Sequence, residues 1–227
     1  LIPKIVIKTD NAKEVQDIIE LSNSMNLSIT FRAAGTSLSG QAISDSILIV
    51  TSRNFSNFKI APDASFISLQ PALTGAQVNG LLAKYSKKIG PDPASINAAM
   101  IGGIAANNAS GMCCGISQNS YKTLKSMKLI FADGAKLDTG CQESKDAFRK
   151  THGDFLKELK NFSNDTKNNE ELRAKIERKF KIKNTCGYSL NALIDFEDEF
   201  EILQHLIIGS EGTLAFIEEI TYYTVED

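Results

Sequence analysis

Residues 91–111 read Pro-Asp-Pro-Ala-Ser-Ile-Asn-Ala-Ala-Met-Ile-Gly-Gly-Ile-Ala-Ala-Asn-Asn-Ala-Ser-Gly, with one charged residue and mostly small side chains. A second stretch of this kind, Arg-Ala-Ala-Gly-Thr-Ser-Leu-Ser-Gly-Gln, occupies residues 32–41 directly after a predicted strand. Glycine, serine and threonine crowd a ligand least, and their backbone N–H groups and hydroxyls can converge on a pyrophosphate. Two such stretches in one small chain are hard to explain as unrelated loops. Together they favour a large dinucleotide bound between them.

The chain before residue 32 is predicted to form a β-α-β unit. Residues 4–8 alternate as a short strand, Asp10 or Asn11 can cap the helix that follows, and residues 27–31 return as a strand. Further short strands are expected at about 47–50, 57–61 and 66–69, followed by a helix that opens near Thr74.

The second half of the chain is predicted to mix strands with surface helices. Residues 124–132 and 135–138 flank Asp133-Gly134, which is a hairpin signature because these residues tolerate positive φ. Residues 143–182 are rich in Lys, Glu and Asn and predict surface helices with a loop. The remaining expectations are a strand or loop over 185–195, a helix over 197–206, a turn at 209–212, and a strand on which Tyr222 and Tyr223 pack at a sheet edge.

Composition and charge exclude several classes of function. The 25 basic and 27 acidic residues give a net charge of −2 without a long run of one sign, which disfavours nucleic acid as a partner. The longest apolar runs fall far short of the roughly 18 residues that a transmembrane helix needs. Four cysteines without a Cys-x-x-Cys pattern, two of them the neighbours Cys113 and Cys114, predict free thiols, a cytoplasmic setting and no metal site.

Other phosphate-binding motifs fail when they are tested directly. Gly35 and Gly40 have the spacing that opens a nucleoside-triphosphate P-loop, but Gln41 and Ala42 stand where Lys and Ser or Thr are required. The Gly-x-Gly-x-x-Gly fingerprint of nicotinamide dinucleotide folds and the Gly-x-Ser-x-Gly elbow of hydrolases do not occur.

Five motifs in a fixed order carry a resemblance to a known family. They are R-x-x-G-T-S-L-S-G-Q at 32–41, P-D-P-x-S with I-G-G and N-N-A-S-G at 91–111, V-x-x-A-D-G at 129–134, K-N-x-x-G-Y-x-L at 183–190, and G-S-E-G-T-L at 209–214. Over nearly the whole chain they resemble the FAD-binding domain of the vanillyl-alcohol oxidase and p-cresol methylhydroxylase superfamily, in its glycolate oxidase and D-lactate dehydrogenase branch. Residues 112–115 and the run around 181–191 look like the long bacterial members, in which the flavin portion is fused to an iron–sulfur portion.

The resemblance implies an α+β fold of the p-cresol methylhydroxylase type. A small N-terminal lobe, residues 1–70, would carry the first pyrophosphate loop, and residues 71–227 would form a larger mixed-sheet lobe flanked by helices. Relatives with covalent flavin place a histidine in the first loop, whereas this chain has none between Lys4 and Lys150, so FAD should bind non-covalently. Ala34 and Ala215 depart from the family, since relatives commonly carry Gly there. The implied FAD-binding residues are Arg32, Ala34, Gly35, Thr36, Ser37, Leu38, Gly40, Gln41, Pro93, Ser95, Ile101, Gly102, Gly103, Asn107, Ser110, Gly111, Tyr188, Glu211, Gly212 and Ile217.

Several side chains have two interpretations. Arg32 could pair with FAD or with a carboxylate, and we favour the carboxylate. Tyr188 could face the flavin ring or simply pack, and Lys183 could be a solvated charge. His152 and His205 lie in charged helical contexts, where structural histidines are expected rather than catalysts.

The activity implied by the resemblance is flavin-dependent dehydrogenation of a 2-hydroxy acid such as D-lactate or glycolate, by hydride transfer to FAD. The base and most of the carboxylate grip would come from a following substrate domain that these residues do not include, so no catalytic residue is assigned and the fragment alone should be inactive. The partners would be that domain and an iron–sulfur portion, and the location cytoplasmic or peripheral at the inner membrane face. The alternative is a flavin module that relays electrons in a multi-subunit oxidoreductase without its own substrate site. The motifs at 183–190 and 209–214 favour the dehydrogenase.

Overall fold

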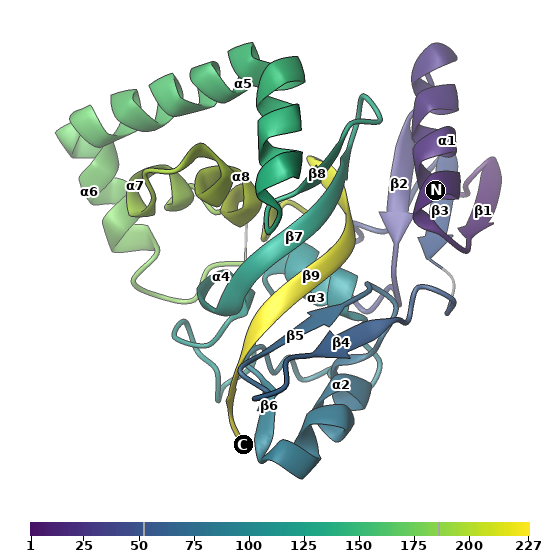
Figure 1. Ribbon diagram of the computed structural model, residues 1–227. Coiled ribbons are helices and arrows are strands. Elements are labelled where there is room, and N and C mark those ends of the chain that lie inside the picture. The colour runs from purple at the N-terminus through teal and green to yellow at the C-terminus, as the bar shows by residue number, and fades with distance from the viewer. Residues whose placement is uncertain (52, 186) are drawn as a thin grey trace.

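The structure is a computed structural model that describes residues 1–51, 53–185 and 187–227. It contains two β-sheets with helices packed around them, so the predicted α+β class is confirmed (Figure 1). The predicted thiols of Cys113, Cys114 and Cys141 are free, and Cys186 lies outside the described residues.

The first sheet is parallel and belongs to the N-terminal lobe. Its elements are β1 (Ile5–Thr9), α1 (Ala12–Ser24), β2 (Ile29–Arg32) and β3 (Ile47–Thr51), with the strand order β1-β3-β2. The central strand β3 is a nearly continuous apolar run, as expected for a parallel strand that is covered on both faces. Asn11 caps α1 by accepting a hydrogen bond from the Glu14 N–H, which confirms the predicted β-α-β start.

The second sheet is antiparallel and forms the second lobe together with most of the helices. Its strands are β4 (Phe58–Ile60), β5 (Phe66–Leu69), β6 (Lys87–Ile89), β7 (Leu124–Phe131), β8 (Lys136–Asp138) and β9 (Ala215–Glu226). They are ordered β4-β5-β9-β7-β8, and β6 also pairs with β9. The strands β4 and β5 belong to this second sheet. The chain therefore passes from the first sheet to the second after β3, which is before the lobe boundary expected at residue 70.

The central position of β9 corrects one prediction. Tyr222 was expected on an edge strand, but β9 lies between β5 and β7. The Tyr222 side chain is fully buried, and its hydroxyl donates to Ser120 Oγ at 2.9 Å. Tyr223 points to the other face of the sheet, where it is exposed and Lys125 lies over its ring.

Helices pack around the second sheet (Figure 1). They are α2 (Gly75–Leu82), the 3-10 helix η1 (Ala83–Tyr85), α3 (Ile101–Asn107), α4 (Ser120–Thr123), α5 (Gln142–Asn168), α6 (Glu170–Lys179), α7 (Ala192–Asp195) and α8 (Glu199–Ile207). Thr74 and Gln77 form a capping box at α2, so the predicted start of this helix is confirmed. In Figure 1, α5 to α8 lie on the opposite side of the long β7–β9 pair from α1. The α5 helix is kinked at His152, whose Nε2 lies 2.8 Å from Asp133 Oδ2.

The two lobes share an apolar core, which fixes their relative position. This shared cluster contains Val15, Ile19, Phe55, Ala72, Ile130 and Phe216. The Phe31 and Phe216 rings also meet, with centroids 5.0 Å apart. Gln16 of α1 donates to the Gly134 carbonyl in the β7–β8 turn at 3.0 Å, so a polar contact reinforces the apolar one.

Candidate functional site

A cleft opens between the lobes where the two small-residue stretches meet. It holds about 1060 Å³ of space, including its open mouth. Its wall comes from the loop after β2, from residues of the second stretch, and from the turn before β9. The predicted residues on this wall are Ala34, Gly35, Thr36, Ser37, Gln41, Ser95, Gly102, Gly103, Asn107, Glu211, Gly212 and Ile217.

The first loop depends on the conformation of Gly35. Its φ is +67°, so a residue with a side chain would be strained here, and its Cβ would lie 2.7 Å from Arg32 Nε and displace the Arg32 side chain. Arg32 therefore packs against the loop backbone. Across the residues that the structure describes, no carboxylate pairs with Arg32, so the favoured ion-pair interpretation is wrong there.

The second stretch approaches the first through α3. A Cβ on Gly103 would lie 3.4 Å from the Ala33 Cβ, whereas one on Gly102 would lie 2.7 Å from the Pro71 Cβ. Thr36 and Gly103 line the same cleft. The predicted meeting of the two stretches is therefore confirmed as geometry, and their contact with a dinucleotide remains a prediction.

Asp92 holds the end of the second stretch in place. Its Oδ1 accepts the Gly111 N–H at 2.7 Å, and its Oδ2 accepts the Cys113 N–H at 3.1 Å. Burial alone would raise the pKa of Asp92, but the hydrogen bonds from the Cys114 thiol and the backbone amides outweigh it and lower the pKa. An ionised carboxylate thus fixes this segment.

Glu211 connects three segments around the cleft. Its backbone N–H donates to the Ala106 carbonyl at 2.8 Å, and its φ of +55° is unusual for a residue other than glycine. Its Oε1 accepts hydrogen bonds from Asn107 Nδ2 and from Gln41 Nε2, the latter at 3.3 Å. Burial raises the pKa of Glu211, and these two hydrogen bonds offset the increase only in part.

Other predicted residues lie off the cleft wall. They are Arg32, Leu38, Gly40, Pro93, Ile101, Ser110, Gly111 and Tyr188. Leu38 is fully exposed at the loop tip, and Ile101 is buried in the core. The Tyr188 side chain is 43% exposed, and its hydroxyl bonds Thr213 Oγ1 at 2.9 Å. Its contact with the flavin stays a prediction.

Lys183 is not simply a solvated charge. Its Nζ donates to the Ser110 carbonyl, which ties the loop before α7 to the end of the second stretch. The Ser110 hydroxyl is buried and, among the described side chains, has no partner. Lys183 therefore supports the position of a neighbouring segment rather than the cleft wall itself.

Sequence reasoning missed the apolar part of the cleft. Phe31, Pro71, Met100 and Phe216 line it, together with Thr51. Phe31, Pro71 and Phe216 lie outside the motifs, and Met100 lies inside the second stretch but at none of its motif letters, because an apolar side chain on a cleft wall has the same sequence signature as one in the core.

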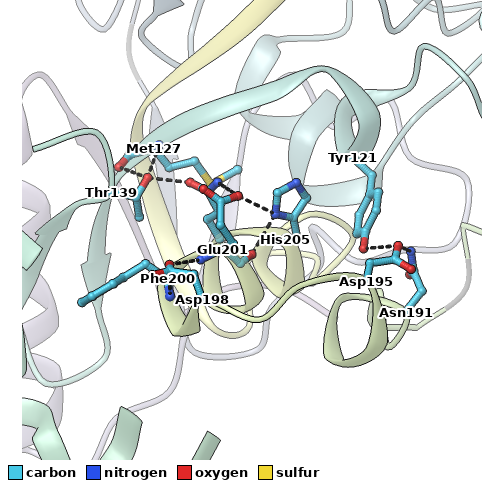
Figure 2. A network of polar contacts seen from close by, with 10 residues as sticks. Tyr121, Met127, Thr139, Asn191, Asp195, Asp198, Phe200, Glu201 and His205 are labelled. Carbon is cyan, nitrogen blue, oxygen red and sulfur yellow. Dashed lines mark hydrogen bonds and ion pairs between the residues drawn. The ribbon is translucent and has the colours of Figure 1, made fainter. Parts of the chain in front are cut away.

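His205 has a structural role, and Figure 2 shows its surroundings. The ring stacks on Phe196 with centroids 4.0 Å apart. Its Nδ1 donates to the Glu201 carbonyl at 2.7 Å. Close by, the Tyr121 hydroxyl donates to Asp195 Oδ2 at 2.8 Å. Burial lowers the pKa of His205 to about 4, so the ring is neutral near pH 7. It does not line the cleft.

Two lobes of an α+β fold whose glycine-rich loops face each other across a cleft define a dinucleotide-binding protein, and the comparisons with known proteins identify the dinucleotide. Residues 3–140 match the FAD binding domain family. The chain belongs to this family, and its cofactor is FAD. The resemblance that the five motifs carried is thereby confirmed.

Relatives and solved structures agree with this assignment. The chain is 27% identical over 219 residues to a D-2-hydroxyglutarate dehydrogenase of Haemophilus influenzae, covering 91% of this chain and 21% of that protein. It is 24% identical over 222 residues to a D-lactate dehydrogenase of Archaeoglobus fulgidus, covering 96% of this chain and 38% of that protein. The structure of 6-hydroxy-D-nicotine oxidase from Arthrobacter nicotinovorans shares the fold, with a TM-score of 0.63 at 12% identity over 100% of this chain and 38% of that one. The chain thus spans only a part of these proteins.

The residues around the cleft fit FAD. The loop from Gly35 to Ser37 and Gly103 opposite it line the cleft with small residues, which crowd a pyrophosphate little. Phe31 and Phe216 give the other part of the wall an aromatic surface that suits a planar ring. Over the described part of the chain, no helix is long and apolar enough to cross a membrane, and no cluster of three or more His, Cys, Asp or Glu could hold a metal ion.

Proposed function

We propose that this chain is the FAD-binding part of a flavin-dependent dehydrogenase whose substrate is a 2-hydroxy acid. The observation that carries the proposal is the extent of the match to the two dehydrogenases, at 91% and 96% of the chain. The match to the D-lactate dehydrogenase, at 96% of the chain, extends beyond residue 140, where the family match ends, and spans the motifs at 183–190 and 209–214. D-lactate and D-2-hydroxyglutarate are the first substrates to test.

The residues of this chain would bind and orient the cofactor. FAD, when bound, supplies the acceptor for the hydride of the carbon that bears the substrate hydroxyl. The backbone of Gly35 to Ser37 would hold the pyrophosphate, with Gly103 leaving room opposite. Asp92 would keep the end of the second stretch in position, and Phe31 and Phe216 would exclude water from the apolar part of the cleft. The base that takes the hydroxyl proton would lie in a part of the protein outside these residues.

Anaerobic reduction of the bound flavin tests the proposal. The protein that contains this chain is mixed with D-lactate, D-2-hydroxyglutarate or glycolate, and the flavin absorbance is followed, with L-lactate as the stereochemical control. Bleaching with one of the D-acids or with glycolate supports the proposal. A flavin that stays oxidised with every 2-hydroxy acid contradicts it and favours the electron-relay function. The 227 residues alone should bind FAD and show no bleaching.

A further inference from the structure

A second pocket lies outside the cleft, between α5, α8, the end of β7 and the turn before β9. It holds about 840 Å³ of space, including its open mouth. All of the residues that line it are apolar except Asp133 and His152. Among the described residues, none lines both this pocket and the cleft, so the pocket is a separate feature of the second lobe.

The kink in α5 gives this pocket its shape. His152 departs from helical geometry, with φ −125° and ψ 27°. The Thr151 hydroxyl lies 3.4 Å and 3.3 Å from the carbonyl oxygens of Ala147 and Phe148, and a hydroxyl that contacts helix carbonyls in this way bends a helix. The helix therefore runs in two directions (Figure 1), and its two halves line the pocket through Phe148 and Phe155.

The second half of α5 carries an apolar stripe that continues from the pocket. Phe155, Leu159 and Phe162 recur at helical spacing, so they lie on one face of the helix. Leu159 is partly buried against the core, whereas Phe155 is 44% exposed and Phe162 is 55% exposed. Large apolar side chains that stay exposed beside an apolar pocket are typical of an interaction surface.

The charged residues that flank this stripe are balanced on one side only. Lys160 and Lys167 both form ion pairs with Glu197, so their flank is neutralised within the chain. Asp154 and Glu158 lie on the opposite flank by helical spacing. Both are exposed, and over the part of the chain that the structure describes neither belongs to an ion pair. The open flank is therefore acidic.

Asp133 adds a third carboxylate at the polar end of the pocket. Its side chain is 56% exposed, its Oδ2 lies 2.8 Å from His152 Nε2, and its Oδ1 accepts the Ala135 N–H at 3.0 Å. Each carboxylate oxygen can accept a further hydrogen bond. An occupant with Lys or Arg beside its apolar side chains would complement this surface in charge as well as in polarity.

We propose that the pocket and the stripe of α5 are the surface on which another part of the same protein docks, with large apolar side chains flanked by Lys or Arg. The relatives are long enough to contain such a segment, because the chain spans 21% of the D-2-hydroxyglutarate dehydrogenase and 38% of the D-lactate dehydrogenase. The apolar side chains would enter between Phe155 and Leu214, and the cations would face Asp154 and Glu158. The inference rests on the proposed function only in that the chain is one part of a longer protein.

Thiol labelling of the full-length protein tests the inference. Phe155→Cys and Phe162→Cys are each treated with a maleimide in buffer and in urea, and peptide mass spectrometry follows the rate at the new thiol. Leu21→Cys, at a 60% exposed position of α1 that does not line the pocket, is the matched control. Relative to their rates in urea, we expect both α5 positions to react at least about tenfold more slowly than the control, because docking covers them.

Reversal of a charge on the acidic flank supplies a second readout. Glu158→Lys should speed labelling at position 155 by about three- to tenfold, because it repels the cations of the docked segment. Glu177→Lys, at an exposed position of α6, is the control and should leave this rate unchanged. An unchanged rate in Glu158→Lys would overturn the basic chemistry of the occupant.

The remaining outcomes also decide the question. Labelling of both α5 positions as fast as in urea would show that nothing docks there. Protection that disappears on dilution would assign the surface to a second copy of the protein and would overturn the inference as well. Neither readout involves the reduction of flavin, so protected thiols together with a flavin that no 2-hydroxy acid bleaches would overturn only the proposed function.

Discussion

Gly103 faces Ala33 across the cleft, so closely that a Cβ on Gly103 would lie 3.4 Å from the Ala33 Cβ. Its neighbour Gly102 faces the opposite way, against Pro71. Adjacent glycines on α3 therefore have separate purposes. Gly103 keeps the space between the lobes open, and Gly102 lets α3 pack on the chain after β5.

A pair of substitutions should separate these purposes. Gly103→Val is expected to lower FAD affinity by about tenfold or more because its methyl groups enter the cleft. Gly102→Ala should cost about 1–3 kcal/mol of stability, since its Cβ would lie 2.7 Å from the Pro71 Cβ. Urea unfolding and FAD titration measure the two effects. Equal FAD affinity in Gly103→Val and wild type would show that FAD does not lie between the loops.

Asp92→Asn should loosen the end of the second stretch. The asparagine oxygen can still accept from Gly111, but its NH₂ group would then oppose the Cys113 N–H, at a cost of about 1–3 kcal/mol. The pKa of Asp92 is lowered below its ordinary value of 3.8. Its contribution to stability is therefore present above pH 3.8 and lost as the pH falls through the lower, folded-state pKa. Thermal unfolding between pH 7 and pH 3 should show that the difference in Tm between wild type and Asp92→Asn becomes smaller towards pH 3.

The loops of this site were predictable because their composition reports backbone conformation. Gly35 needs a positive φ and Gly102 a close contact, and both requirements restrict the residue type. The hydrogen bond from Gln41 to Glu211 was not predictable. Gln41 lies 170 residues from Glu211 in sequence, and a glutamine that only contacts solvent would have the same neighbours in sequence. The residue pattern around Tyr222 could not show that β9 is a central strand. Such a pattern indicates which face of the sheet a side chain lies on, and it does not indicate which strands pair with β9.

FAD should leave the protein on denaturation. No histidine lies between Lys4 and Lys150, so the first loop lacks the residue to which relatives attach flavin. Acid precipitation of the yellow protein should release all of the flavin into the supernatant, where its absorbance is measured. Yellow colour that remains in the washed pellet would contradict the prediction, and a peptide map would then locate the bond.

His205 should make stability depend on pH in the mildly acid range. Its pKa falls from 6.5 to about 4 because of burial, so the unfolded chain takes up a proton more readily than the folded one. The neutral ring's contribution is fully present above pH 6.5 and is lost as the pH falls towards 4, by up to about 3 kcal/mol. His205→Phe keeps an aromatic ring on Phe196 and should flatten this dependence in urea unfolding. An identical pH slope in both proteins would assign the dependence to other groups.

Glu211 should make FAD affinity depend on pH, because it lies on the cleft wall and the family resemblance implies that it binds FAD. Burial raises the pKa of Glu211, and the side chains bonded to it, Asn107 and Gln41, do not titrate. The ionised form accepts hydrogen bonds from hydroxyls more strongly than the protonated form, so FAD affinity should rise as the pH rises through this pKa and level off above it. The stability of the FAD-free protein should change in the opposite direction and fall as the pH rises, because a raised pKa favours the folded state at low pH. Titrations between pH 4 and pH 8 should show this rise in wild type and none in Glu211→Gln, and an equal rise in both would assign it to another group.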